Sequence, residues 1–142
     1  MKKFYYLLSL VSVFVIPTIV AGYFLQDIVT PQKLIPFIIF ITVIGSIWDI
    51  WATKHGKKDS VWLWQFNHQQ TLGIKIFDLP IEEYLFYVTS SIYIVYMWEG
   101  IKQMTQAGNS QLSIVIPLLT LWTLLAILLP YKLGSRGDKL IE

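Results

Sequence analysis

The chain has 142 residues, of which 55% are hydrophobic and 14% are charged. Soluble domains carry about 25% charged residues, so this composition indicates a membrane protein and excludes a disordered chain. The absence of cysteine excludes disulfides, thiolate metal sites and cysteine nucleophiles. The formal net charge of +2 is too small for a protein that binds nucleic acid.

Four apolar stretches are long enough to cross a bilayer, which takes about 20 helical residues. We therefore predict an all-α integral membrane protein, a single domain over residues 1–142 built as a bundle of about four transmembrane helices. The first stretch is too long for a signal peptide and lacks a cleavage site, so we expect it to be retained. The predicted spans are residues 4–25, 34–52, 79–98 and 112–131.

Lysine and arginine predict the orientation, because these residues are enriched in cytoplasmic segments of membrane proteins. With both termini cytoplasmic, the inside segments hold nine of them and the outside segments only Lys33 and Lys102. The outside turns, 26–33 with Pro31 as a breaker and 101–111, are short, and residues 53–78 form the long cytoplasmic loop. The sequence thus predicts a multi-pass protein of the cell membrane.

Three of the prolines in the predicted spans stand more than one residue away from a span end. Each removes one backbone hydrogen bond and can kink its helix, which membrane helices tolerate when neighbouring groups replace the lost bond. They are Pro17, Pro36 and Pro117.

Three acidic residues stand where predicted spans meet the cytoplasmic side. Asp49 is in the last turn of the second span, and Glu82 and Glu83 are in the first turn of the third. Because the second span ends on the side where the third begins, we expect all three at one depth. Glu99, in contrast, is expected at the outer end of the third span, where it can reach water. An ionisable residue inside a span is a candidate for function by default.

Each of these carboxylates also has an ordinary structural explanation. Glu82 and Glu83 could simply favour the positive end of the helix dipole after Pro80. Asp49 could pair with Lys54 or His55. Adjacent helical residues point about 100° apart, so the two glutamates can both border one pocket without both pointing straight into it.

Aromatic residues crowd the same depth. They form either an interfacial aromatic belt or the lining for a flat apolar substrate and for a cation that forms on it. They are Trp48, Trp51, Trp62, Trp64, Phe66, Phe77, Tyr84, Phe86 and Tyr87.

Motifs for metals, nucleotides and redox cofactors are missing. The spacing of His55 and His68 matches no known metal motif. The sequence also has no Gly-rich phosphate loop, no G-x-S-x-G and no dinucleotide fingerprint. We therefore expect neither a metal nor a cofactor.

Several short motifs follow one another along the chain. They are Trp-Asp-Ile-Trp-Ala from Trp48, Trp-Gln-Phe from Trp64 and Leu-Pro-Ile-Glu-Glu from Leu79, with a glycine in each interval. In this order they resemble the lycopene cyclase domain, the membrane-embedded, heterodimeric type of carotenoid cyclase. The resemblance covers about residues 4–101, and Tyr87 stands where the family usually has a phenylalanine.

The resemblance implies an enzyme that closes the linear end of lycopene, or of a C50 carotenoid, into an ionone ring. A proton adds to the terminal double bond, the next double bond attacks the cation, and a proton is lost, with no net redox change. Burial beside apolar rings and a second carboxylate favours the protonated form that a donor needs. We expect Glu82 or Glu83 as the donor and Asp49 as the orienting group or base. The expected substrate-binding residues are Trp48, Trp64, Phe66, Phe86 and Tyr87.

The resemblance also implies a partner. Complete enzymes of this family contain two such units, whereas this chain carries one unit and a fourth span beyond it. We expect a second homologous subunit or a homo-oligomer, and a lipophilic carotenoid that enters from the membrane lipid. The alternatives are a non-catalytic partner or assembly subunit with a structural acidic cluster, and a hydratase in which water captures the same cation.

Overall fold

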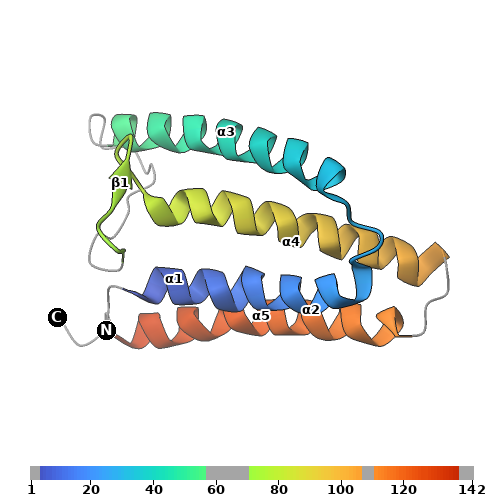
Figure 1. Cartoon of the computed structure of the whole chain (residues 1–142). Coiled ribbons are helices and arrows are strands. Elements are labelled where there is room, and N and C mark those ends of the chain that lie inside the picture. The colour runs from blue at the N-terminus through green and yellow to red at the C-terminus, as the bar shows by residue number, and fades with distance from the viewer. Residues whose placement is uncertain (1–3, 57–70, 107–110, 138–142) are drawn as a thin grey trace. The chain divides into compact units, whose positions relative to one another are not determined.

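The computed structural model of the chain describes residues 4–56, 71–106 and 111–137, with side chains up to residue 128. Within these ranges nearly all residues are helical, which confirms the predicted all-α class. The described part forms four long helical segments and one short hairpin (Figure 1). The segments are the N-terminal helical run Tyr5–Leu25, α3 (Pro31–Gly56), α4 (Ile81–Gln106) and α5 (Leu112–Gly137).

The N-terminal helical run widens just before Pro17. There the Ile16 N–H donates to the carbonyl of Val11, five residues back, which is the bonding pattern of a π-helix. The next bond in this pattern would need an N–H on Pro17, which proline lacks, so the carbonyl of Ser12 is left for another donor. The run consists of α1 (Tyr5–Leu10), the π-helix η2 (Val11–Val15) and α2 (Ile16–Leu25).

The helices α3, α4 and α5 each continue beyond the C-terminal limit of the predicted span. A helix satisfies its own backbone hydrogen bonds, so it need not stop where the apolar residues stop. Pro31 was expected to interrupt helical structure within the turn 26–33. It is instead the first residue of α3, where its missing N–H costs nothing. Pro36 and Pro117 both lie inside helices.

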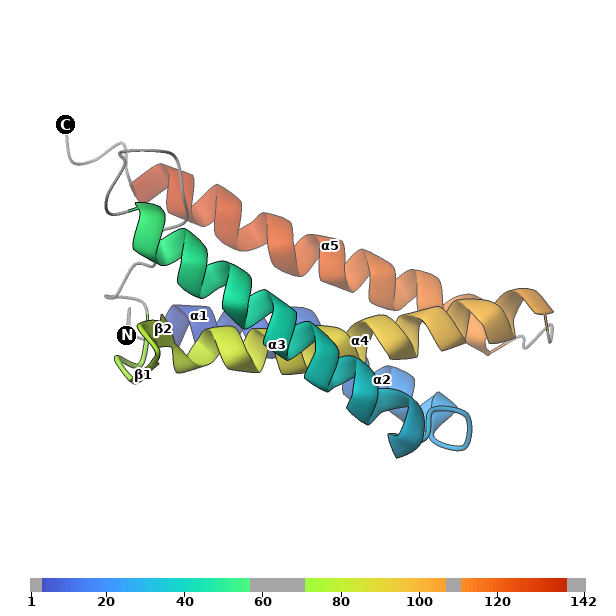
Figure 2. The same ribbon diagram turned by 90° about the horizontal axis from the view of Figure 1, so that it is seen from above.

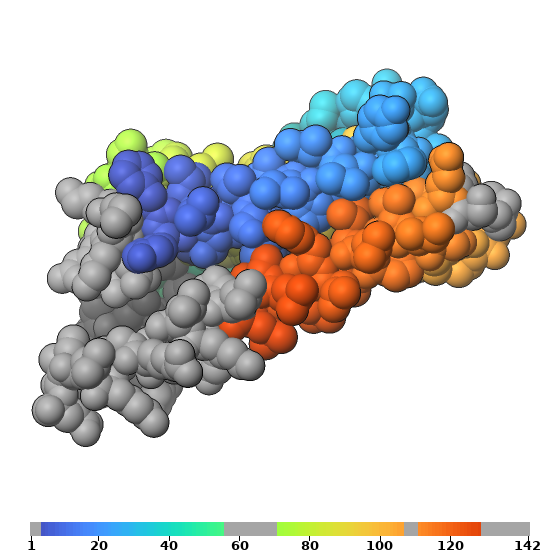
Figure 3. Space-filling model, turned by 90° about the horizontal axis from the view of Figure 1, so that it is seen from below, coloured from blue at the N-terminus to red at the C-terminus, as the bar shows by residue number. Residues whose placement is uncertain are grey.

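The chain forms two compact units, unit 1 with Met1–Leu8 and Thr30–Ile92, and unit 2 with Ser9–Val29 and Tyr93–Glu142. In unit 2, η2 and α2 pack against α5. Figure 3 shows the blue side chains of this N-terminal part lying against the orange side chains of α5. The indole of Trp122 on α5 donates to the free carbonyl of Ser12 at 2.9 Å. This contact replaces the hydrogen bond that Pro17 removes.

Glu99 lies in unit 2 and differs from its predicted environment. It was expected at the water-facing end of the third span, but α4 continues to Gln106 and Glu99 is buried within the helix. Its carboxylate is paired with Lys102 at 3.0 Å. The ion pair within one helix accounts for a buried charge at this position.

Unit 1 contains α3, the first half of α4 and the hairpin between them. Its strands β1 (Lys75–Ile76) and β2 (Leu79–Pro80) pair antiparallel. The C-terminal end of α3, the hairpin and the first turn of α4 lie at the same end of this unit (Figures 1 and 2). This arrangement brings the region of Asp49 toward that of Glu82 and Glu83.

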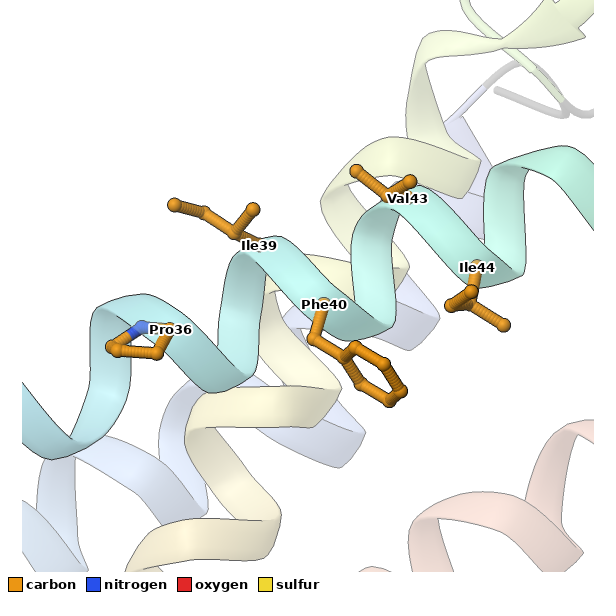
Figure 4. A pocket seen from close by; sticks show the side chains of 5 residues that line it. All are labelled: Pro36, Ile39, Phe40, Val43 and Ile44. Atoms are coloured by element: carbon orange, nitrogen blue, oxygen red, sulfur yellow. The ribbon is translucent and has the colours of Figure 1, made fainter.

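Two helices of the described part are long and apolar enough to cross a membrane, Tyr5–Leu25 and Pro31–His55. A further apolar helix covers Leu112–Leu128. Large apolar side chains on α3 are exposed, and a shallow depression among them has an entirely apolar lining (Figure 4). A continuous apolar face of this kind is typical of a surface that contacts lipid or protein. The depression is lined by Pro36, Ile39, Phe40, Val43 and Ile44.

Candidate active site

Asp49 is buried on α3, with 7% of its surface exposed. The Tyr87 hydroxyl, on α4, donates to Asp49 Oδ2 at 2.5 Å. Gly45, one turn before Asp49, makes this approach possible, because a Cβ at this position would overlap the Tyr87 ring. His55, one of the alternative partners for Asp49, instead donates from Nδ1 to the carbonyl of Trp51 at 2.9 Å.

Glu83 is buried at the start of α4, with 4% of its surface exposed. The hydroxyl of Tyr6, on α1, donates to Glu83 Oε1. Glu83 also lies within electrostatic range of Asp49. Three helices of unit 1 therefore bring two carboxyl groups and two tyrosines together. We call this group the acidic cluster: Tyr6, Asp49, Glu83 and Tyr87.

Glu82 has a different environment from its neighbour. It is fully buried, and its Oε1 accepts a hydrogen bond from the backbone N–H of Leu72 at 2.5 Å. Its Oε2 makes no hydrogen bond with any residue that the structure describes. The two glutamates thus contact different segments, as their expected angular separation requires.

The glutamates do more than complement the dipole of their own helix. The first N–H of α4, on Ile81, donates to the carbonyl of Ile74 at 2.9 Å. The Glu82 and Glu83 carboxyl groups bind Leu72 and Tyr6, which lie outside α4. Both side chains therefore connect α4 to other parts of unit 1.

The hairpin is held against the start of α4. Its turn residues, Phe77 and Asp78, have φ angles of 51° and 69°. Positive φ at both central residues is the requirement of a type I′ turn, which Asn-Gly normally meets at lower cost. The Tyr84 hydroxyl of α4 donates to the carbonyl of Ile76 at 3.0 Å. This bond and the Leu72–Glu82 bond fix the segment that precedes α4.

The predicted aromatic residues are not all in one place. Trp48 is 62% exposed and packs against Trp51 with the rings tilted by 36° and their centroids 5.3 Å apart. Phe86 packs edge-to-face against Tyr87 at 5.4 Å, and is therefore next to the acidic cluster. Trp64 and Phe66 lie outside the described residues, as does His68.

Tyr6 and Gly45 were missed by the sequence reasoning. Tyr6 lies in the first turn of the first predicted span, which starts on the side where the second span ends. This shared depth of Tyr6 and Asp49 could have indicated that Tyr6 lies near the acidic residues. Gly45 is one helical turn from Asp49, on the same face, and a small residue there signals a close approach of another side chain.

The acidic cluster is suited to proton transfer. Each tyrosine donates to one oxygen of a carboxyl group, so that oxygen is an acceptor and the other oxygen can carry a proton. Two carboxyl groups in electrostatic contact resist becoming ionised together. The pair can therefore hold a proton on one group while the other is a base.

The fold and this cluster define a mainly helical protein with two buried carboxyl groups, as far as the described residues show. The sequence model of the lycopene cyclase family matches residues 2–101. The chain therefore belongs to the lycopene cyclase family, and this membership supports a role related to carotenoid cyclisation. No curated protein and no solved structure matched the chain.

Proposed function

We propose that this protein is a membrane-embedded subunit of a carotenoid cyclase. Glu83 protonates the terminal double bond of the linear carotenoid end, the next double bond attacks the tertiary cation, and Asp49 accepts the proton that is lost. The observation that carries the proposal is the acidic cluster, in which two buried carboxyl groups are each bound by a tyrosine. One proton enters and one leaves, so the reaction has no net redox change.

Each glutamate has one oxygen engaged by a donor, Glu82 by Leu72 and Glu83 by Tyr6, so this feature does not separate them. Glu83 is the better donor because it interacts electrostatically with Asp49, the proposed base. The carbon atoms that gain and lose a proton belong to the same new ring. The acid and the base must therefore lie close together.

The cation needs stabilisation while the ring closes. An ionised carboxylate in a site without bulk water stabilises it strongly, because the charge is not screened. The ring of Tyr87, whose hydroxyl binds Asp49, and the Phe86 ring that packs against it add cation–π attraction. The substrate is an oil-soluble polyene, so its end enters from the surrounding lipid.

The proposed enzyme acts with a second unit. The family match covers residues 2–101 of this chain, and the resemblance implies that complete enzymes contain two such domains. We propose that the active form contains either a second homologous subunit or another copy of this chain. Co-expression with a neighbouring cyclase gene, compared with expression alone, distinguishes the two.

Paired substitutions at the adjacent glutamates test the proposed acid. In cells that accumulate lycopene and express the cognate partner, we expect Glu83→Gln to reduce ring formation at least about 100-fold, the usual contribution of a general acid. Glu82→Gln is the matched control, because a glutamine oxygen still accepts the bond from Leu72. Cyclised carotenoids are measured by chromatography, relative to the amount of protein in the membrane.

The outcome also separates the alternatives. If Glu83→Gln retains full activity and Glu82→Gln loses it, Glu82 is the donor. If both variants retain full activity, neither glutamate is the acid, and a non-catalytic partner subunit becomes the better description. Mass spectrometry distinguishes the reaction types, since cyclisation leaves the carotenoid mass unchanged and hydration adds the mass of water.

A further inference from the structure

Three hydroxyl groups on α3 are buried without a hydrogen-bond partner among the described residues: Thr42 Oγ1, Ser46 Oγ and Thr53 Oγ1. Hydroxyls in membrane helices normally donate back to the carbonyl four residues earlier. On α4, Thr89 does so at 2.7 Å, and on α5, Thr123 does so at 2.9 Å. On α2, Thr18 Oγ1 is likewise buried without a described partner, but only α3 carries three such hydroxyls.

These hydroxyls share a face of α3 with Asp49. Positions 42, 46, 49 and 53 repeat at intervals of three and four residues, which places them in one row along a helix. With a rise of about 1.5 Å per residue, Thr53 lies about 6 Å from Asp49 toward the C-terminal end of α3. Thr42 lies about 10 Å from Asp49 in the other direction.

Leaving the hydroxyls of this row without any hydrogen-bond partner would cost free energy. A buried hydroxyl without a partner costs about 1–3 kcal/mol, and three of them share one face of α3 with a carboxyl group. Ser46 is only 8% exposed, so bulk solvent does not supply its partner. Buried water does supply such partners where several polar groups line one site.

We propose that a file of water molecules runs along this face of α3, from Thr53 past Asp49 and Ser46 to Thr42. The file connects Asp49 with the aqueous phase at the C-terminal end of α3. Its use depends on the proposed function, because it would exchange the proton that Asp49 takes from the ring with the solvent. The presence of the water itself does not depend on that function.

Silver ions test the file, because they are nearly as small as water and react with thiols only where water reaches them. The chain has no cysteine, so each variant carries a single thiol. The probes are Ser46→Cys and Thr42→Cys. Their matched controls are Ile47→Cys and Val43→Cys, at the neighbouring positions, where the native side chains are 61% and 51% exposed on the apolar face.

The reaction is run on the full chain in membranes without carotenoid, and the remaining thiols are counted with a maleimide after denaturation. We expect silver to modify each probe at least about tenfold faster than its control, following the difference between wet and lipid-facing positions. Equal rates for probe and control at both pairs would overturn the proposal. If Ser46→Cys does not accumulate in the membrane, the comparison of Thr42→Cys with Val43→Cys tests the proposal by itself.

The result is separable from the proposed function. A chain whose probes react but whose Glu83→Gln variant still forms rings refutes the acid assignment and leaves the water file intact. A chain that forms rings through Glu83 but protects both probes refutes the water file alone.

Discussion

Tyr6, Gly45 and Tyr87 decide which carboxyl groups of unit 1 come together. Tyr87 reaches Asp49 only because Gly45 has no side chain beneath the tyrosine ring. Tyr6, which is 77 residues earlier in the chain, donates to Glu83. These contacts separate the roles of adjacent glutamates, which composition and spacing treat as equivalent.

The glycine gives the sharpest test at this scale. We expect Gly45→Ala to displace the Tyr87 ring, lower stability by about 1–3 kcal/mol through overpacking and reduce cyclised product at least about tenfold. Product is measured per amount of membrane-inserted protein. Gly22→Ala on α2 is the control, because its Cβ would lie 3.6 Å from the Tyr96 ring, an ordinary contact. Equal activity of the two variants would show that the fit of Tyr87 is unimportant.

At the scale of elements, the π-helix η2 shows how a proline is accommodated without breaking a helix. Pro17 removes the donor for the Ser12 carbonyl, and Trp122 of α5 supplies another. The Ser12 carbonyl, which Pro17 leaves without a helical donor, thus forms a contact with α5. Pro31 is accommodated differently, at the first position of α3, where no N–H is needed.

A double-mutant cycle measures this replacement. We expect Trp122→Phe to destabilise the protein by about 1–2 kcal/mol, because the Ser12 carbonyl loses its donor. In a Pro17→Ala background the same substitution should cost less, since the restored N–H can bind the carbonyl. Unfolding is followed in detergent micelles, with Trp98→Phe at an exposed position as control. Identical costs in both backgrounds would contradict the explanation.

At the scale of the whole molecule, the distribution of charge and apolar surface governs how the chain meets a membrane. Basic residues gather in the segments that join the second and third helices and in the tails. Large apolar side chains are exposed along α3 and the described part of α5, where water would be unfavourable. The basic residues remain the basis of the prediction that both ends are cytoplasmic.

Impermeant thiol labelling tests that orientation on the cysteine-free chain. Asp27 precedes α3 and Lys54 lies in its last turn, and both are exposed. We expect a charged maleimide to label Asp27→Cys on intact cells and Lys54→Cys only after permeabilisation. Labelling of Lys54→Cys on intact cells would contradict the predicted orientation.

The sequence by itself determined the helical class, the family and the three acidic candidates, because apolar length and short motifs are local properties. It placed Asp49 near Glu83 through topology alone, since consecutive membrane helices must reverse at a shared depth. Only the tertiary structure assigned different partners to Glu82 and Glu83, added Tyr6 and Gly45, and turned Trp48 away on an exposed face. Those outcomes depend on the rotation of each helix about its axis and on packing between distant segments, which hydropathy does not encode.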